Sequence, residues 1–346
     1  MIWKSRERHA TVGTNHGALF ELDSYIPASI ALNLFKHFDA AHYRNWLDVL
    51  DARLRLQVDH VLEDGVHDEH SIYYSYRMAL SFSYFLALFA ENQDGITPNQ
   101  EPLAAIRDAI RKLNYYMIYA ITPLWPQLDE HKVFTASDIP AIGDSKALWV
   151  KNFGKVIPHS RFDSFLNKPI ALGYAKYWDE ENLLKTLTYV ANPHLEKAIQ
   201  FDLAPTRFFA PSGIFIARSN WLTEDGLSYD TAARYCYFKG GEMVPTPGPY
   251  PGYATSSHHA HADVLSVELS AYDEKLFAEA GGHIFRSNGE IIDNLDRRRY
   301  TELYGYESKF NDFLTARHYF KGTAAHNTVY VNPVSYTHLT LPTSDL

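Results

Sequence analysis

The stretch His259-Ala260-His261-Ala262-Asp263-Val264-Leu265-Ser266-Val267-Glu268-Leu269 leads from a histidine-rich segment into alternating apolar and polar residues. A period of two is typical of a β-strand with one buried face, so the pattern predicts a strand over 264–271. On an extended segment, His259 and His261 point to the same side. Two imidazoles there can hold a divalent metal ion, or one can hold the metal while the other faces a substrate.

Two residues farther along the chain could complete a metal site. Glu279 follows a short strand predicted over 275–278, and His326 lies in Thr323-Ala324-Ala325-His326-Asn327-Thr328. Two histidines and a glutamate with an open fourth position are a known zinc ligand set. Two other hydrolase classes use a similar HxH spacing, but one needs histidine where this chain has Val264, and the other needs alternating strands and helices.

The chain divides into a helical part and a β-rich part. Apolar residues recur at three- and four-residue steps over 30–61, 73–90, 103–117 and 183–199, which predicts amphipathic helices. From about residue 208 the period becomes two, with further β-rich runs at 233–238 and 328–331. We therefore expect an all-α half followed by an antiparallel sheet.

Composition excludes several classes of protein. The 346 residues are 46% hydrophobic and 21% charged, with no apolar run near the ~20 residues of a spanning helix, so we expect no membrane insertion. The net charge of -9, without a basic block, argues against nucleic-acid binding. Cys236 is the single cysteine, which excludes an internal disulfide and a cysteine-based zinc site. The 14% of aromatic residues suits a protein that stacks on sugars, although a large core uses aromatics too.

Polar clusters also occur in the helical half. Asn15-His16-Gly17 precedes an apolar run, and 64–76 combines acids, histidines and tyrosines. The simpler interpretation of the second cluster is a loop that leads into a helix capped by Asp68 or Ser71.

Both ends of the sequence differ from those of a complete protein. The start has no signal-peptide pattern. The string Val334-Ser335-Tyr336-Thr337-His338-Leu339-Thr340-Leu341-Pro342-Thr343 resembles a translated adapter used to prepare sequencing libraries. We therefore expect a fragment of a longer gene with a non-native tail over 334–346.

Taken in order, these clusters resemble the motifs of the heparinase II/III-like polysaccharide lyases, which include heparinases and several alginate lyase families. The matching segments are Asn15-His16-Gly17, Asp64-Gly65 with Glu69, Ser71 and Tyr74, Ser212-Gly213 to Arg218 with Trp221, 259–269, and 323–329. The resemblance covers about 15–333. It implies an incomplete α/α toroid over 1–200 and an incomplete antiparallel β-sandwich over 201–333.

The resemblance also implies an activity. Such lyases cleave polysaccharides that contain uronic acids by β-elimination, in which donors neutralise the carboxylate, a base removes the C5 proton and an acid protonates O4. Asn15 and His259 correspond to the carboxylate neutralisers, with His16 beside them. Tyr74 corresponds to the base, the acid or both, and His16 takes the base role otherwise.

By the same resemblance, His261, Glu279 and His326 correspond to the ligands of a structural Zn²⁺. The implied partner is an acidic polysaccharide, and family analogy favours a periplasmic or secreted protein. Two alternatives remain: a toroid glycoside hydrolase that uses carboxylates among Asp64, Asp68 and Glu69, and an inactive sugar-binding relative.

Overall fold

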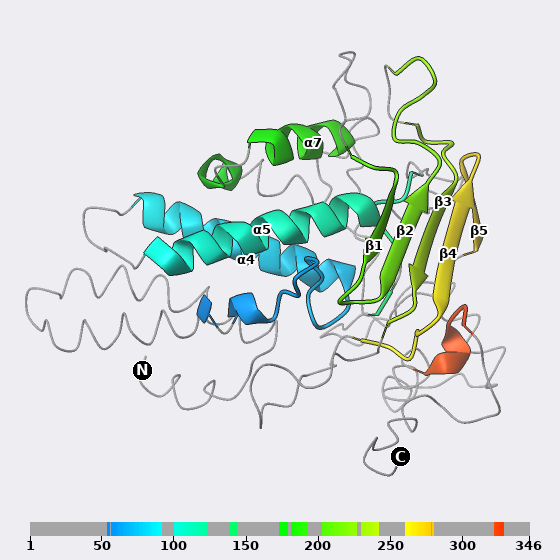
Figure 1. Ribbon diagram of the computed structural model, residues 1–346, viewed down its shortest axis with the longest axis horizontal. Coiled ribbons are helices and arrows are strands. Elements are labelled where there is room, and N and C mark those ends of the chain that lie inside the picture. The colour runs from blue at the N-terminus through cyan, green and yellow to red at the C-terminus, as the bar shows by residue number, and fades with distance from the viewer. Residues whose placement is uncertain are drawn as a thin grey trace, which may run out of the picture.

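The computed structural model describes residues 54–55, 57–91, 100–123, 139–140, 142–143, 173–178, 181–191, 203–226, 230–241, 260–277, 279 and 322–328. Within these residues the helices come before the strands along the chain. The helices form one group, and the sheet stands beside their ends (Figure 1).

Besides helical residues at 54–55 and 57–59, three α-helices make up the described helical part. They are α4 (Ile72–Glu91), α5 (Gln100–Ala120) and α7 (Glu181–Ala191), with a 3₁₀ turn η3 (Tyr174–Tyr177) before α7. The apolar stripes of 73–90 and 103–117 fall within α4 and α5, which confirms those two helices. Of the helix predicted over 183–199, the structure describes the part up to Ala191. The expected helix over 30–61 lies largely outside the described residues.

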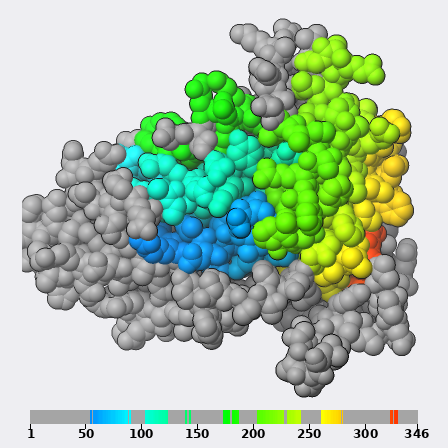
Figure 2. Space-filling view, in the orientation of Figure 1, coloured from blue at the N-terminus to red at the C-terminus, as the bar shows by residue number. Residues whose placement is uncertain are grey.

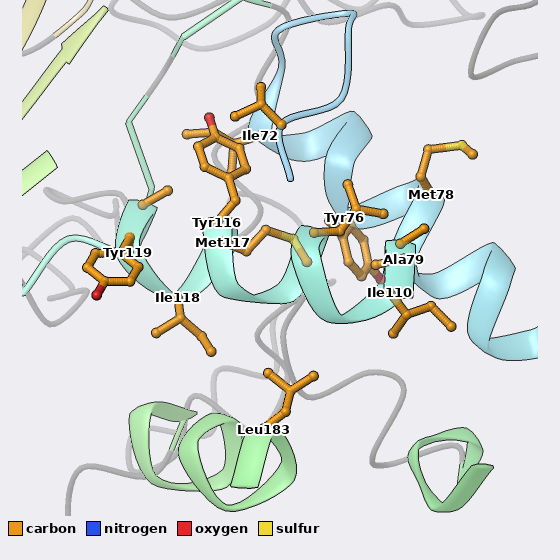
Figure 3. Packing of buried hydrophobic residues seen from close by; sticks show 14 of the residues in the cluster. Ile72, Tyr76, Met78, Ala79, Ile110, Tyr116, Met117, Ile118, Tyr119 and Leu183 are labelled. Atoms are coloured by element: carbon orange, nitrogen blue, oxygen red, sulfur yellow. The ribbon is translucent and has the colours of Figure 1, made fainter. Parts of the chain in front are cut away.

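The helices pack through the apolar faces that the periodicity predicts. Ile106, Ile110, Leu113 and Met117 of α5 are all buried. Tyr76 of α4 points toward α5, and Leu183 of α7 approaches α5 from its other side (Figure 3). Burying such side chains contributes about 1.5–3 kcal/mol each to folding, so packing and not helix propensity holds these elements together.

Five antiparallel strands form one sheet in chain order. They are β1 (Thr206–Phe209), β2 (Ile214–Arg218), β3 (Tyr235–Lys239), β4 (Ser266–Ala271) and β5 (Glu274–Phe277), in the order β1-β2-β3-β4-β5 (Figure 1). The short turn η4 (Thr323–Ala325) lies near one end of β4. In β2 and β3, buried and half-buried residues alternate, as expected for strands with one face on a core.

The strand predicted over 264–271 starts later than the sequence pattern indicated. β4 begins at Ser266, because the Ser266 N–H donates to the Asp263 carbonyl at 3.2 Å and closes a turn. Leu265 within that turn has a φ of 64°, a left-handed conformation that a strand cannot contain. The predicted strand over 275–278 is observed as β5, ending at Phe277. Of the β-rich run 328–331, only Thr328 lies within the described residues.

The buried face of the sheet packs against the helices, and specific polar contacts fix the two parts together. The hydroxyls of Tyr116 on α5 and Tyr237 on β3 lie 2.9 Å apart, and Tyr235 donates to the Ala120 carbonyl at 2.9 Å. The Arg218 guanidinium donates to the carbonyls of Tyr119 and Ile121 at 3.0 and 2.7 Å. The space-filling view shows strands and helices meeting in continuous contact on this side of the molecule (Figure 2).

Within the part of the chain that the structure describes, no helix combines the length and apolar character needed to cross a bilayer.

Candidate functional site

Tyr74 lies in the first turn of α4. Its side chain is buried, and its ring meets the ring of Tyr73 edge-on, with centroids 5.2 Å apart. Tyr74 is absent from the described hydrophobic core cluster, to which Tyr76 belongs. Burial raises the pKa of Tyr76 to about 12, which makes that phenol a poor acid near neutral pH.

The loop before α4 is a compact turn held by its own polar groups. Val61 and His67 form a β-bridge, and the Leu62 N–H donates to the Val66 carbonyl at 2.9 Å. Gly65 at the tip has a φ of 94°, and a Cβ there would lie 2.3 Å from the Lys112 carbonyl oxygen on α5. Only glycine fits both requirements. The turn is thus fixed against α5.

Histidines and acids fill the rest of this loop. A 2.5 Å hydrogen bond joins His60 Nδ1 to Asp68 Oδ2, and His67 Nδ1 lies 3.4 Å from Asp68 Oδ1. Glu69, beside them, is buried. Asp68 therefore pairs with His60, whereas the sequence offered it as a helix cap.

Asp64 connects this loop to the sheet. Its Oδ2 accepts hydrogen bonds from both the backbone N–H and the hydroxyl of Ser212, at 2.9 and 2.8 Å, across 148 positions of sequence. Ser212 and Gly213 form the turn between β1 and β2. The two motif segments at 64–76 and 212–221 are therefore in direct contact.

Arg218 and Trp221 of the second motif form a stacked pair. The guanidinium carbon lies 3.6 Å from the centre of the tryptophan ring, and the arginine is buried. Because Arg218 also donates to carbonyls at the end of α5, this motif serves to hold the helices on the sheet.

A buried ion pair lies near the start of β4. Lys239 Nζ is 2.5 Å from Asp263 Oδ1, and neither side chain is exposed. Asp263 Oδ2 accepts a hydrogen bond from the Gly143 N–H at 2.9 Å. Burial by itself would raise the pKa of Asp263, but the Lys239 ammonium and the imidazoles of His326 and His261 lower it to about 2. Asp263 is therefore a carboxylate at neutral pH.

His70 lies close enough to this ion pair to be affected by it. Burial, followed by the charge of Lys239, lowers the pKa of His70 to about 3. Neither ring nitrogen has a hydrogen-bond partner among the described residues. His70, in the loop that leads to Tyr74, is thus a neutral imidazole.

The three predicted metal ligands come together in space. The rings of His261 and His326 have centroids 5.3 Å apart, and His326 Nδ1 lies 2.7 Å from Glu279 Oε2. Glu279 Oε1 accepts the Asn327 N–H at 3.0 Å and also contacts the Ser266 hydroxyl. Burial raises the pKa of Glu279, and its contact with His326 opposes that rise. His326 thus lies beside both other residues, and the three come from separate segments of the chain.

Two observations bear on whether this cluster suits a zinc ion. The donor set is appropriate, and the buried Nε2 of His326 has no hydrogen-bond partner in the described part of the chain. Glu279, however, contacts His326 directly, and no group of three or more His, Cys, Asp or Glu side chains among the described residues has an arrangement that would hold a metal ion. The residue types fit zinc, and the zinc site stays a prediction.

The other predicted site residues fall outside the described part of the chain. These are Asn15, His16 and His259. Tyr74 lies in the first turn of α4, directly after the loop that contacts the sheet, and His326 lies beside both His261 and Glu279.

Lys239 and His70 were not singled out from the sequence. In Tyr235-Cys236-Tyr237-Phe238-Lys239, the strand period puts the lysine on the same face as two tyrosines. A lysine on the buried face of a strand is unusual without a partner, and that pattern could have drawn attention to it.

Comparisons with known proteins agree with this architecture. The profile of the family described as Heparinase II/III-like, C-terminal, matches residues 239–343. That part of the chain, which begins at Lys239 and contains all three predicted metal ligands, belongs to the heparinase II/III-like family.

Solved structures resemble the chain over most of its length. A crystal structure of heparinase III is 16% identical in sequence, with a TM-score of 0.54. The match covers 92% of this chain and 41% of the heparinase III chain. Heparan sulfate lyase HepC from Pedobacter heparinus has 15% identity and a TM-score of 0.52, with 89% of this chain and 36% of its own covered. The protein thus has a heparinase III-like fold and spans about two fifths of those chains. No protein with a curated functional description matches the chain.

Proposed function

We propose that this protein is a polysaccharide lyase that cleaves uronic-acid-containing polysaccharides by β-elimination. The observation that carries the proposal is the junction between the loop of Tyr74 and the sheet. Asp64, in the loop that leads to Tyr74, accepts hydrogen bonds from the backbone N–H and the hydroxyl of Ser212 on the sheet. This contact supports the proposal, because the chemistry needs a tyrosine from the helical part and a histidine from the sheet part. The family match and the heparinase III-like fold support the same reading.

The elimination balances without a water nucleophile. A base takes the proton from C5, the electron pair of that C–H bond forms the C4=C5 double bond, and the C4–O4 bond breaks. An acid gives a proton to the departing O4. Because negative charge builds on the C5 carboxylate, donors must neutralise it in the transition state.

We assign these roles to residues of this chain by their match to the family motifs. Asn15 and His259 neutralise the carboxylate, with His16 beside them. Tyr74 acts as base, acid or both, and His16 is the base if proton and leaving group lie on opposite faces of the sugar. In the larger architecture, the helices belong to an α/α toroid and the sheet to a β-sandwich.

Heparan sulfate is the first polymer to test, because the similar structures are a heparinase III and a heparan sulfate lyase. Alginate, hyaluronan and glucuronan complete the panel. A rise in ultraviolet absorbance on one polymer reports the new C4=C5 bond. Tyr74→Phe should abolish this rise, while Tyr73→Phe, which removes a hydroxyl from the neighbouring ring, should retain it. A folded wild-type protein that raises absorbance on none of the polymers would refute the lyase.

The hydrolase alternative has less support. It needs a pair of carboxylates open to a sugar. Asp64 is occupied by Ser212, and Asp68 is occupied by His60. An inactive sugar-binding relative is tested by the same assay, because it would bind a polymer without changing its absorbance.

We also propose that His261, Glu279 and His326 hold a structural Zn²⁺. The zinc would brace the segment around His261 and would not contact the substrate. Metal analysis of the folded protein should give about one zinc per chain, and a chelator should lower the melting temperature. His326→Ala should lose both the metal and the chelator effect. Folded wild-type protein without zinc would refute the site.

A further inference from the structure

The ion pair of Lys239 and Asp263 takes no part in the proposed proton transfers, yet both side chains are fully buried. Lys239 is the last residue of β3, on the face that packs toward the helices. Asp263 immediately precedes the turn that starts β4. The pair therefore joins two neighbouring strands at their ends.

Backbone contacts strengthen this connection. The Leu265 N–H donates to the Lys239 carbonyl at 2.6 Å, and Lys239 is the register partner of Ser266. Side chain and main chain of Lys239 thus hold both sides of the turn at 263–266. These contacts add to the hydrogen bond from Ser266 to Asp263 that closes the turn around the left-handed Leu265.

The second carboxylate oxygen of Asp263 reaches the helical part. It accepts the Gly143 N–H at 2.9 Å, from a segment 120 positions away in sequence. One buried carboxylate is therefore bound from the sheet on one side and from the 142–143 turn on the other. This arrangement fixes its position in two directions.

Residues of the candidate site lie on both sides of the pair. His261 is two residues before Asp263, is buried, and lies beside His326. His70, within electrostatic range of both charges, is four residues before Tyr74. Gly240, next to Lys239, donates its N–H to the Gly213 carbonyl at 2.8 Å, and the neighbouring Ser212 binds Asp64 of the loop that leads to Tyr74, so contacts connect the ion pair to that loop.

Stability alone does not explain two buried charges here. The loss of hydration offsets much of the attraction in a buried ion pair, and well-packed apolar replacements are often neutral or stabilising. The hydrogen bonds of the pair end on defined carboxylate oxygens, so they fix the orientation of Asp263. An apolar contact would not do this.

We propose that Lys239, acting through Asp263, is a positioning residue that holds the segment 260–263 at a fixed place against the loop leading into Tyr74. The inference rests on the proposed lyase function and adds two residues to it. Neither residue touches the substrate. Their contribution is the alignment of the sheet-borne histidine segment with the helix-borne tyrosine.

The test compares kcat and KM of the full chain and its variants on the polymer that wild type cleaves. Lys239→Met combined with Asp263→Asn removes both charges and keeps an oxygen that can accept from Gly143. We expect kcat to fall by about tenfold to 100-fold, because small misplacements of reacting groups have effects of that size. KM should change by less than about threefold, since no substrate contact is removed. Lys239→Arg, which keeps the cation, should recover part of the loss.

The matched control is the exposed pair of Lys185 and Glu181 on α7, with Nζ and Oε1 2.6 Å apart. Lys185→Met combined with Glu181→Gln should leave kcat and KM unchanged. Wild-type kcat in the folded double variant of Lys239 and Asp263 would overturn the inference.

If that double variant does not fold, Lys239→Leu combined with Asp263→Asn decides the question, because it also leaves no isolated buried charge. A fall in kcat of about tenfold with unchanged KM supports positioning, and wild-type kcat overturns it. The two proposals fail in different ways. An inactive, folded wild type refutes the lyase, whereas an active wild type with equally active variants refutes the positioning role.

Discussion

Lys239 Nζ lies 2.5 Å from Asp263 Oδ1, with both side chains shielded from solvent. Lys239 is the last residue of β3, Asp263 lies before the turn that starts β4, and 23 residues lie between their positions 239 and 263. The contact joins the end of β3 to the turn before β4, and Gly143 extends it to the helical part. Both stability and activity should therefore depend on this pair.

Removing one charge of the pair should destabilise the protein strongly. Lys239→Met leaves the Asp263 carboxylate buried without its cation, which costs about 3–5 kcal/mol of unfolding free energy. Adding Asp263→Asn should recover much of that loss, because no isolated charge then remains. Urea unfolding at neutral pH measures both values.

The control for this prediction is Lys185→Met on α7. Its partner Glu181 is exposed, so the change should cost far less than Lys239→Met. Equal effects of the two lysine substitutions would show that the buried pair has no special energetic role.

His70 should make the stability of the protein depend on pH. Burial and the charge of Lys239 lower its pKa from 6.5 to about 3 in the folded state. The charges of Asp263 and Asp68 oppose this decrease, and His67 adds to it. A lowered pKa means that the unfolded chain binds the proton more readily. The contribution of His70 is therefore fully present above pH 6.5 and is lost as pH falls from there toward about 3.

At pH 5 this loss should be about 2 kcal/mol relative to pH 7.5. His70→Asn removes the titrating group and keeps a residue type that tolerates the positive φ of this position, 49°. The difference in unfolding free energy between wild type and variant should shrink by that amount as pH falls. A difference that stays constant between pH 7.5 and 5 would contradict the burial of a neutral His70.

Hydrophobic periodicity predicted the elements whose burial pattern follows from their own local sequence. The stripe of Ile106, Ile110 and Met117 indicated α5 correctly, because each of these side chains is buried by the helix geometry itself. The start of β4 was predicted two residues too early. A β-branched Val264 and an apolar Leu265 extend the alternation, but the Asp263 turn overrides local propensity.

The candidate site was predictable as residue types and only partly as contacts. His261, Glu279 and His326 could be grouped because histidine and glutamate are ligand types, and the structure brings them together. The contact between Asp64 and Ser212 spans 148 positions, and nothing in either local sequence specifies the other. Such pairs are set by the packing of α5 on the sheet.

The Asp64–Ser212 contact should contribute to the stability of the junction. Ser212→Ala removes the hydroxyl that donates to the Asp64 carboxylate at 2.8 Å and leaves the backbone donor in place. A hydrogen bond to a charged group is worth about 1.5–3 kcal/mol, so we expect a loss in that range.

Thr223→Ala is the comparison for this hydroxyl. Thr223 donates to Asp225 at 2.6 Å on the exposed surface, where water can replace the bond. The loss of unfolding free energy should therefore be about 0.5 kcal/mol. If Ser212→Ala costs no more than Thr223→Ala in urea unfolding, the contact does not hold the two parts together.

Gly65 offers the sharpest steric test of the loop that leads to Tyr74. Gly65→Ala would put a Cβ 2.3 Å from the Lys112 carbonyl oxygen, at a φ of 94° that alanine rarely adopts. Main-chain atoms of α5 cannot move aside cheaply, so the loop itself must shift. Gly226→Ala is the matched control, because its φ is 70° and nothing lies within 4 Å of the new Cβ. It should cost about 1–2 kcal/mol through backbone strain alone. Gly65→Ala should cost clearly more in urea unfolding and should also lower kcat, because the displaced loop disturbs the contact of Asp64 with Ser212 and the start of α4, where Tyr74 lies. Equal losses in the two variants would mean that the turn at 64–66 is not pressed against α5 in solution.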